Sequence, residues 1–381
     1  MTIAQTHAGA RLPTIQDRLD AAAGHPTGFD ALRIGLAVCI LCFHSVYASY
    51  GIPADLALWA GPWRGVLSLF LPMFFALSGF LVCGSLERTK KLHHFFGLRA
   101  IRIVPALAVE TLLCAMILGP MLTTLSLSEY FAHPDFSRYF LNIIGVIHYE
   151  LPGMFENNPS PNMVNISLWT IPYELKCYLA LALAAVLGLM KRRWLFLTIT
   201  ALVCLALPLR HELSGAPDIF WRPSGRMLVM AFVCGLLMYR FRDLLAHNGY
   251  LAGASLILAI ILFMSPGWAM LGVPFAAYFT VYLGMLNIPP LPLVKNGDYS
   301  YGLYLFAFPM QQVQAQLFPA YHEWYWNAAF ALVLGMAYAM FSWHCVEKPI
   351  LARKKSLLAG FDGAIGWLMR PDAKAKNSAS A

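Results

Sequence analysis

The stretch GVLSLFLPMFFALSGFLVCGSL, residues 65–86, contains no charged side chain. A helix of about 20 apolar residues crosses the hydrocarbon core of a bilayer, so this stretch predicts a transmembrane helix. Nine other apolar stretches of comparable length occur along the chain, and short polar segments separate them. The ten predicted spans lie at about residues 31–50, 65–86, 103–125, 167–190, 194–209, 225–239, 250–264, 268–286, 299–317 and 326–345.

The composition of the whole chain indicates the same class of protein. Of its 381 residues, 59% are hydrophobic and only 12% are charged, which differs strongly from the usage of soluble domains. We therefore predict an all-α fold, a polytopic membrane helix bundle with about ten transmembrane helices. The eight cysteines lie in or at the ends of the predicted spans, so disulfides are not expected.

The basic residues predict the direction of the spans, because Lys and Arg concentrate in cytoplasmic loops. If the N-terminus lies inside, 21 of the 27 Lys and Arg residues fall in inner segments, and an even number of spans returns the C-terminus to the cytoplasm. This pattern predicts a bacterial inner-membrane protein with a cytoplasmic segment at 1–28, one membrane domain at 29–350 and a cytoplasmic tail at 351–381. The net charge of +8 then reflects topology and attraction to membrane lipids, and no nucleic-acid partner is expected.

Ionisable side chains inside predicted spans are candidates for function, because burying them in lipid is costly. In the first span Arg33 lies at the inner end and His44 follows eleven residues later, about 16 Å along a helix. In the fourth span Glu174 lies about 10 Å below the outer end. His44 and Glu174 are therefore predicted at similar depth, where a carboxylate would orient an imidazole acting as general base. A structural role for a buried histidine is the alternative.

Arg99 and Arg102 lie three residues apart at the predicted cytoplasmic end of the third span. At this spacing they share one helix face, and their guanidinium groups suit a phosphate ligand. The alternative is that they only anchor the inner end of the helix.

The longest loop, at about residues 125–166, is predicted on the outside. Loops of this length are often functional, and its aromatic and amide side chains suit a sugar surface. A passive cap over the helix bundle is the alternative.

These residues resemble the motifs of acyltransferase family 3, whose members are membrane proteins that O-acylate sugars. The resemblance covers about residues 29–350. The family's arginine followed by ten residues and a histidine corresponds to Arg33 and His44, and its R-x-x-R signature corresponds to Arg99 and Arg102. The remaining family blocks resemble FFALSGFL (74–81), Trp169 with Glu174, DYSYGLYL (298–305) and VEKP (346–349).

The resemblance implies an enzyme that transfers an acyl group, expected to be acetyl, from cytoplasmic acyl-coenzyme A to a hydroxyl of an extracytoplasmic or lipid-linked carbohydrate. Acetyl-coenzyme A is thus the expected donor, and a carbohydrate or glycolipid is the expected acceptor. Whether the protein forms a homo-oligomer is left open, and no metal site is predicted.

The resemblance also implies roles for His44, Arg33, Glu174, Arg99 and Arg102, and the remaining site residues are predicted from their position and chemistry. The predicted catalytic residues are His44, Arg33 and Glu174. The predicted donor-binding residues are Arg99, Arg102, Lys90 and Lys91. The predicted acceptor-binding residues are Asn165, Trp169, Tyr173 and Tyr301.

One departure from the family is visible in the ninth span. Many members have a histidine after its Tyr-Leu pair, where this chain has Phe306, so a second imidazole is not expected there. Direct transfer and transfer through an acyl-imidazole on His44 both stay open. The alternative function is that of a membrane transporter, in which the buried Arg, His and Glu residues form a relay for protons or substrate.

Overall fold

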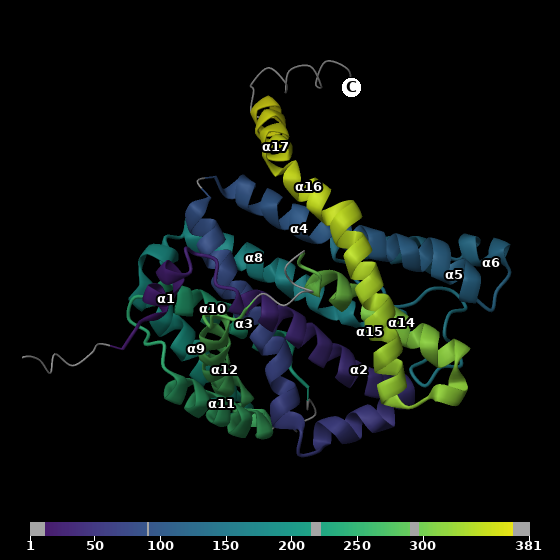
Figure 1. Cartoon of the computed structure of the whole chain (residues 1–381), viewed down its shortest axis with the longest axis horizontal. Helices are drawn as coiled ribbons and strands as arrows, with labels where there is room; N and C mark the ends of the chain where they lie inside the picture. Colours follow the sequence, from purple (N-terminus) through teal and green to yellow (C-terminus); the bar gives the residue numbers. More distant parts are fainter. Residues whose placement is uncertain (1–11, 90, 215–221, 290–296, 369–381) are drawn as a thin grey trace, which may run out of the picture. The chain divides into compact units, whose positions relative to one another are not determined.

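The computed structural model describes residues 12–89, 91–214, 222–289 and 297–368 (Figure 1). These residues form helices and connecting turns, and the described part of the chain has no β-strand. Thr14 and Ala246 form an isolated antiparallel β-bridge, which is not part of a strand. The prediction of an all-α fold is confirmed.

Each of the ten predicted spans coincides with a helix. These helices are α2 (Gly28–Ala60), α3 (Arg64–Arg88), α4 (Leu92–Leu113) with its continuation α5 (Gly119–Leu122), α8 (Ile171–Val186), α9 (Arg193–Ser214), α10 (Gly225–Arg240), α11 (Gly249–Met264), α12 (Ala269–Gly284), α14 (Ser300–Leu317) and α15 (Trp324–Phe341).

Length and composition allow some of these helices to cross a bilayer. Within the described ranges, five helical segments are both long and apolar enough: Gly28–Ala60, Arg64–Arg88, Leu92–Leu122, Arg193–Arg210 and Trp324–Ala352. Helices α11 and α12 are apolar but shorter. The protein is thus a helical membrane protein, while the count of ten spans and the side on which the termini lie stay predictions.

The chain divides into two compact units. The first contains the described residues up to Leu36, Leu58–Cys83 and the described part of Leu183–Pro292. The second contains Ala37–Ala57, Gly84–Ala182 and the described residues from Gly297 onward.

In the first unit, glycines bring α3 and α10 into direct backbone contact. The Cα of Gly79 on α3 faces the backbone carbonyl of Phe232, and the Cα of Gly235 on α10 faces the backbone carbonyl of Ala76. A Cβ atom at either glycine would overlap the opposite carbonyl. Small residues allow such close approach between helices in membranes, where packing rather than the hydrophobic effect drives association.

In the second unit, α14 carries three buried amide side chains. Gln311, Gln312 and Gln314 are almost completely buried, although they lie in an apolar helix. From the adjacent helix α15, Asn327 Nδ2 donates to Gln311 O (2.9 Å) and to Gln314 Oε1 (2.7 Å). These bonds satisfy polar groups that would otherwise be costly to bury.

Two π-helical turns interrupt helices of the second unit. One, Cys114–Leu118, joins α4 to α5, and the other, Ser342–Glu347, joins α15 to α16 (Lys348–Ala352). Residues five apart point in different directions on an α-helix, whereas a π-turn brings them to one side. Accordingly, Ser342 Oγ donates to Glu347 Oε1 at 2.9 Å.

The long loop predicted at 125–166 contains local helices. These are α6 (Leu127–Ala132) and α7 (Pro134–Tyr139), and Ser126 begins α6 with a capping box that includes Glu129. Each has only six residues, too few for a clear apolar period. The end of the loop is fixed to the helices of the second unit, because Ser160 Oγ donates to Tyr47 O (2.9 Å) on α2.

Candidate active site

His44 lies on α2 beside α14. Its imidazole is half-buried and meets the ring of Phe308 edge-on, with ring centroids 5.7 Å apart. The adjacent Ser45 hydroxyl donates to Leu41 O (3.0 Å) and accepts from Gln311 Nε2 (2.7 Å). The predicted base is therefore held against an aromatic wall, with polar groups of α2 and α14 next to it.

Gln311 contributes an acceptor to this region. Its Nε2 donates to Leu41 O (2.8 Å) as well as to Ser45, which fixes the orientation of the side-chain amide. Its Oε1 is buried and accepts no hydrogen bond from the residues that the structure describes. A buried acceptor without a donor is costly, so this region contains an unsatisfied polar group inside the packed protein.

Arg33 and His44 lie on one continuous helical stretch, because the break in the helical geometry of α2 comes later, at Gly51. Arg33 Nη1 lies 3.5 Å from Asp30 Oδ1 in the first turn of α2. The catalytic roles of Arg33 and His44 stay predictions.

Glu174 lies in the first turn of α8 and accepts a hydrogen bond from Tyr178 OH, one turn further on. The ring of Tyr178 is in turn 5.9 Å from the Arg99 guanidinium carbon. The fourth span was predicted to start at 167, but Ile166–Thr170 form a 3-10 turn, so α8 begins later than expected. Glu174 is thus linked through Tyr178 to the arginine region, and its predicted pairing with His44 stays a prediction.

The two arginines of the R-x-x-R motif have different surroundings. Arg102 Nη2 forms an ion pair with Asp298 Oδ2, and Asp298 Oδ1 accepts a 2.6 Å hydrogen bond from Ser300 Oγ. Arg99 has a longer hydrogen bond, 3.3 Å from its Nη2 to Ser85 Oγ, and its buried Nε has no partner among the described residues. Arg102 is therefore bound to a carboxylate, whereas Arg99 retains a donor for a ligand.

Of the two lysines predicted to bind the donor, Lys90 lies outside the described residues. Lys91 immediately precedes α4, and its Nζ lies 3.0 Å from Asp362 Oδ2 on α17 (Lys354–Leu368). Hydrogen bonds from His93 and from Lys91 hold the pKa of the Asp362 carboxyl well below its usual range. The described partner of Lys91 is thus a carboxylate of the same chain.

The predicted acceptor-binding residues make different kinds of contact. Trp169 and Tyr173 pack edge to face, with ring centroids 5.8 Å apart. Tyr301 OH donates to Ile103 O (3.3 Å), close to Arg102 in the chain. No contact of the described residues shows what these aromatic side chains bind, and their roles stay predictions.

Asn165 is fully buried, unlike the aromatic residues. Its Nδ2 donates to Glu110 Oε1 (2.8 Å) and to Leu305 O (2.7 Å), and its Oδ1 accepts from Ser167 N (3.1 Å). These bonds use both amide hydrogens inside the protein. This arrangement favours a positioning role for Asn165 over direct contact with a substrate.

Glu110 was not singled out from the sequence, although it is fully buried and receives the Asn165 hydrogen bond. It is the sole acidic residue of the predicted span 103–125, so the cost of burying a carboxylate in lipid would have marked it. Gln311 and Gln312 were missed for a different reason: amides carry no charge and fall within an otherwise apolar stretch.

Helix α14 connects the arginine region with the histidine region. Tyr301 near its start contacts Ile103, and Phe308 seven residues later contacts His44. Seven residues of α-helix rise about 10 Å. The imidazole of His44 and the arginine region therefore lie next to two different turns of α14. A guanidinium group could bind an anionic carrier while the imidazole acts on the group that is transferred.

Comparison with known proteins agrees with this chemistry. A family model described as an acyltransferase domain matches residues 27–344. The chain is similar to an "O-acetyl transferase" of Shigella phage Sf6, with 29% identity over 87% of this chain and 98% of the phage protein. It is also similar to "Nodulation protein 10" of Rhizobium leguminosarum bv. viciae, with 26% identity over 88% of this chain and 96% of that protein.

No solved structure matches the chain. The family match alone covers far more than half of its length, from before the first predicted span almost to the end of the last. The chain therefore belongs to acyltransferase family 3 and is an acyltransferase.

Proposed function

We propose that this protein is a membrane O-acyltransferase that moves an acyl group, expected to be acetyl, from acyl-coenzyme A to a carbohydrate hydroxyl. Membership of the acyltransferase family is the observation that carries the proposal. The name of the phage relative supports acetyl as the group and oxygen as the acceptor atom. The predicted topology supports a donor that arrives from the cytoplasm and an acceptor that is extracytoplasmic or lipid-linked.

The donor would bind at the arginine region. Coenzyme A carries phosphate groups, and guanidinium groups form strong charge-assisted hydrogen bonds with phosphate. Arg99 is the better candidate of the pair, because its Nε has no partner within the described ranges whereas Arg102 is paired with Asp298. Arg102 would then set the charge and shape of the site through Asp298.

His44 would act as the base. A neutral ring nitrogen takes the proton of the acceptor hydroxyl while the hydroxyl oxygen attacks the thioester carbonyl carbon. The carbon–sulfur bond breaks, and the thiolate of coenzyme A leaves and takes up the proton from the imidazolium. Gln311, close by on α14, would position the α2 segment beside His44 through its hydrogen bonds to Leu41 O and Ser45 Oγ.

The test uses the full chain in lipid nanodiscs with acetyl-coenzyme A labelled in the acetyl group. We expect release of free coenzyme A that depends on added acceptor glycans, and loss of this release in His44→Ala. The matched control is His322→Ala, which removes an exposed imidazole far along the chain. A wild-type protein that moves glycolipid without consuming thioester would contradict the proposal and favour the transporter alternative.

The acceptor can be identified separately. Comparing surface glycans of a strain that lacks the gene with those of its parent should show one ester missing at a defined hydroxyl. Unchanged esterification of every surface glycan would contradict a carbohydrate acceptor while leaving the thioester assay as a test of acyl transfer.

A further inference from the structure

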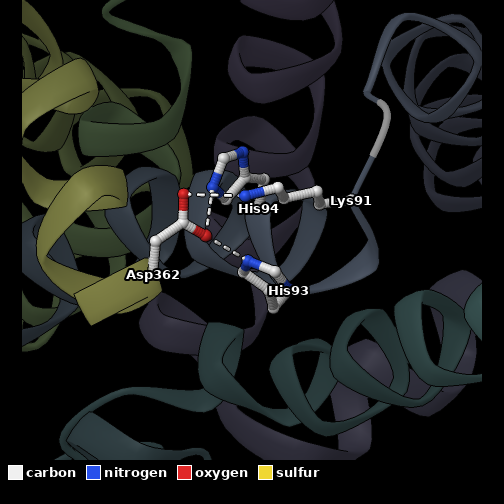
Figure 2. Close-up of polar contacts among 4 residues, drawn as sticks. All are labelled: Lys91, His93, His94 and Asp362. Atoms are coloured by element: carbon white, nitrogen blue, oxygen red, sulfur yellow. Dashed lines mark hydrogen bonds and ion pairs between the residues drawn. The ribbon is translucent and has the colours of Figure 1, made fainter. Parts of the chain in front are cut away.

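A cluster of potential metal ligands joins the start of α4 to α17 and takes no part in the proposed acyl transfer. It consists of His93 and His94 in the first turn of α4 and Asp362 on α17 (Figure 2). Their ligand atoms all lie within 4.8 Å of one another. The three side chains are between 25% and 34% exposed, so an ion could reach them from solvent.

The two imidazoles converge on a single oxygen atom. His93 Nε2 lies 2.6 Å and His94 Nε2 lies 3.0 Å from Asp362 Oδ1. Two consecutive residues of a helix point about 100° apart, so their convergence on one atom requires a partner placed between them. Figure 2 shows Asp362 in this position, with both rings turned toward its carboxylate.

The second oxygen of the carboxylate has a different partner. Lys91 Nζ lies 3.0 Å from Asp362 Oδ2, so the ammonium group and the two imidazoles bind opposite oxygens (Figure 2). In metal sites, a carboxylate commonly binds the ion through one oxygen while the other accepts a hydrogen bond that orients it. In this cluster Oδ2 of Asp362 already has the hydrogen-bond donor, and Oδ1 faces the two imidazoles.

We propose that His93 Nε2, His94 Nε2 and Asp362 Oδ1 bind a divalent transition-metal ion of the zinc type, with Lys91 orienting the carboxylate. Two imidazoles and one carboxylate suit zinc, which takes four ligands at about 2.0 to 2.2 Å. Such ligand atoms lie about 3.3 Å apart around a tetrahedral ion. The distances from His93 Nε2 and His94 Nε2 to Asp362 Oδ1, now 2.6 and 3.0 Å, would therefore increase by less than about 1 Å when the ion binds. A water molecule would be the fourth ligand.

This proposal departs from the prediction that the chain has no metal site. No spacing pattern predicts one, because His94 and Asp362 are 268 residues apart and Asp362 lies in the predicted cytoplasmic tail. Adjacent histidines near a lysine look like part of a basic loop. The bound ion would fasten α17 to the first turn of α4, and the inference does not depend on the proposed acyl transfer.

The test measures zinc uptake by the full chain in nanodiscs after chelator treatment. We expect one equivalent of zinc per chain, measured by competition with a fluorescent chelator. We also expect cobalt to give the visible absorption of a tetrahedral site. Asp362→Asn and the double variant His93→Ala with His94→Ala should each weaken zinc binding more than tenfold. Lys91→Met should weaken it by about tenfold, as loss of an outer-shell partner does.

The matched control is His322→Ala, which removes an imidazole that also neighbours a carboxylate, 3.8 Å from Glu323 Oε1. This variant should bind zinc like the wild type. Failure of the wild type to take up zinc, or equal uptake by all variants, would overturn the proposal and leave the cluster as an ion pair between α17 and α4. If Asp362→Asn does not fold, the cobalt spectrum of the wild type and zinc binding by the double histidine variant still decide the question.

Discussion

Replacing Arg99 by alanine should weaken donor binding far more than it destabilises the protein. Arg99 makes one 3.3 Å hydrogen bond to Ser85, and its guanidinium carbon lies 6.0 Å from the Phe95 ring and 5.9 Å from the Tyr178 ring. Its buried Nε has no described partner, so the protein contacts that are lost are weak ones. A charge-assisted hydrogen bond to a ligand phosphate contributes about 1.5 to 3 kcal/mol. The dissociation constant for coenzyme A should therefore rise about tenfold to a hundredfold.

Arg102→Ala should lower the stability of the protein more than it weakens donor binding. Its ion pair with Asp298 is about a quarter exposed on the arginine side and 18% exposed on the aspartate side. Removing one partner of such a half-buried pair should cost about 1 to 3 kcal/mol of unfolding free energy, because the remaining carboxylate loses its counter-charge. Asp298→Asn should lower the stability similarly, and the double variant should be little worse than either single one.

Both quantities can be measured on the same nanodisc samples. Isothermal titration with coenzyme A gives the dissociation constant, and thermal unfolding followed by tryptophan fluorescence gives the stability. Arg192→Ala is the matched control, because it removes an exposed arginine of another predicted inner segment. Unchanged coenzyme A affinity in Arg99→Ala, or an equal loss in Arg192→Ala, would show that Arg99 serves only as a positive charge at the membrane surface.

Three further predictions concern other residues. His44→Ala should abolish acyl transfer while leaving the unfolding temperature almost unchanged, and turnover within a factor of a few of the wild type would contradict a base at this position. Glu110→Leu should lower the unfolding free energy by about 1 to 3 kcal/mol, because it removes one of the two acceptors of the Asn165 amide group. Glu110→Gln should cost much less, and equal losses would contradict this account. Burial lowers the pKa of His247, which stacks on Tyr282, so the folded state favours the neutral ring. Protonation below about pH 6.5 therefore favours unfolding, and the unfolding temperature should fall from pH 7.5 to 5.5 less in His247→Gln than in the wild type.

The fold class and the helix positions could be predicted because apolar length is a strong local signal. All ten predicted ranges coincide with helices, although α8 in the fourth range begins at Ile171, after the 3-10 turn Ile166–Thr170 that Asn165 caps. Asn165 accepts a hydrogen bond from Ser167 N and thereby ends the irregular loop before the helix starts. Hydropathy does not register such a local hydrogen bond, so the predicted span was too long at this end.

The partners of the site residues could not be predicted in the same way. Arg99 and Arg102 share one helix face by their spacing, yet Asp298 lies 196 residues from Arg102 and no periodicity connects them. Depth along the predicted spans predicts that Glu174 pairs with His44, and this pairing stays a prediction because depth alone does not determine which side of each helix faces the other. The hydrogen bond between Glu174 and Tyr178 depends on the side-chain direction within α8, which depth does not contain.

The π-helical turn at Ser342–Glu347 affects how this protein should be compared with its relatives. Such a turn corresponds to one residue inserted into an α-helix, and it rotates everything that follows by about 100° about the helix axis. A relative with one residue fewer at this point would direct the side chain aligned with Glu347 to another face. In such a relative, the residue that takes the place of Glu347 in space would be one position away from it in the sequence. Deleting Trp343 should therefore turn Glu347 away from Ser342, whereas a substitution at Trp343 would leave the direction of Glu347 unchanged.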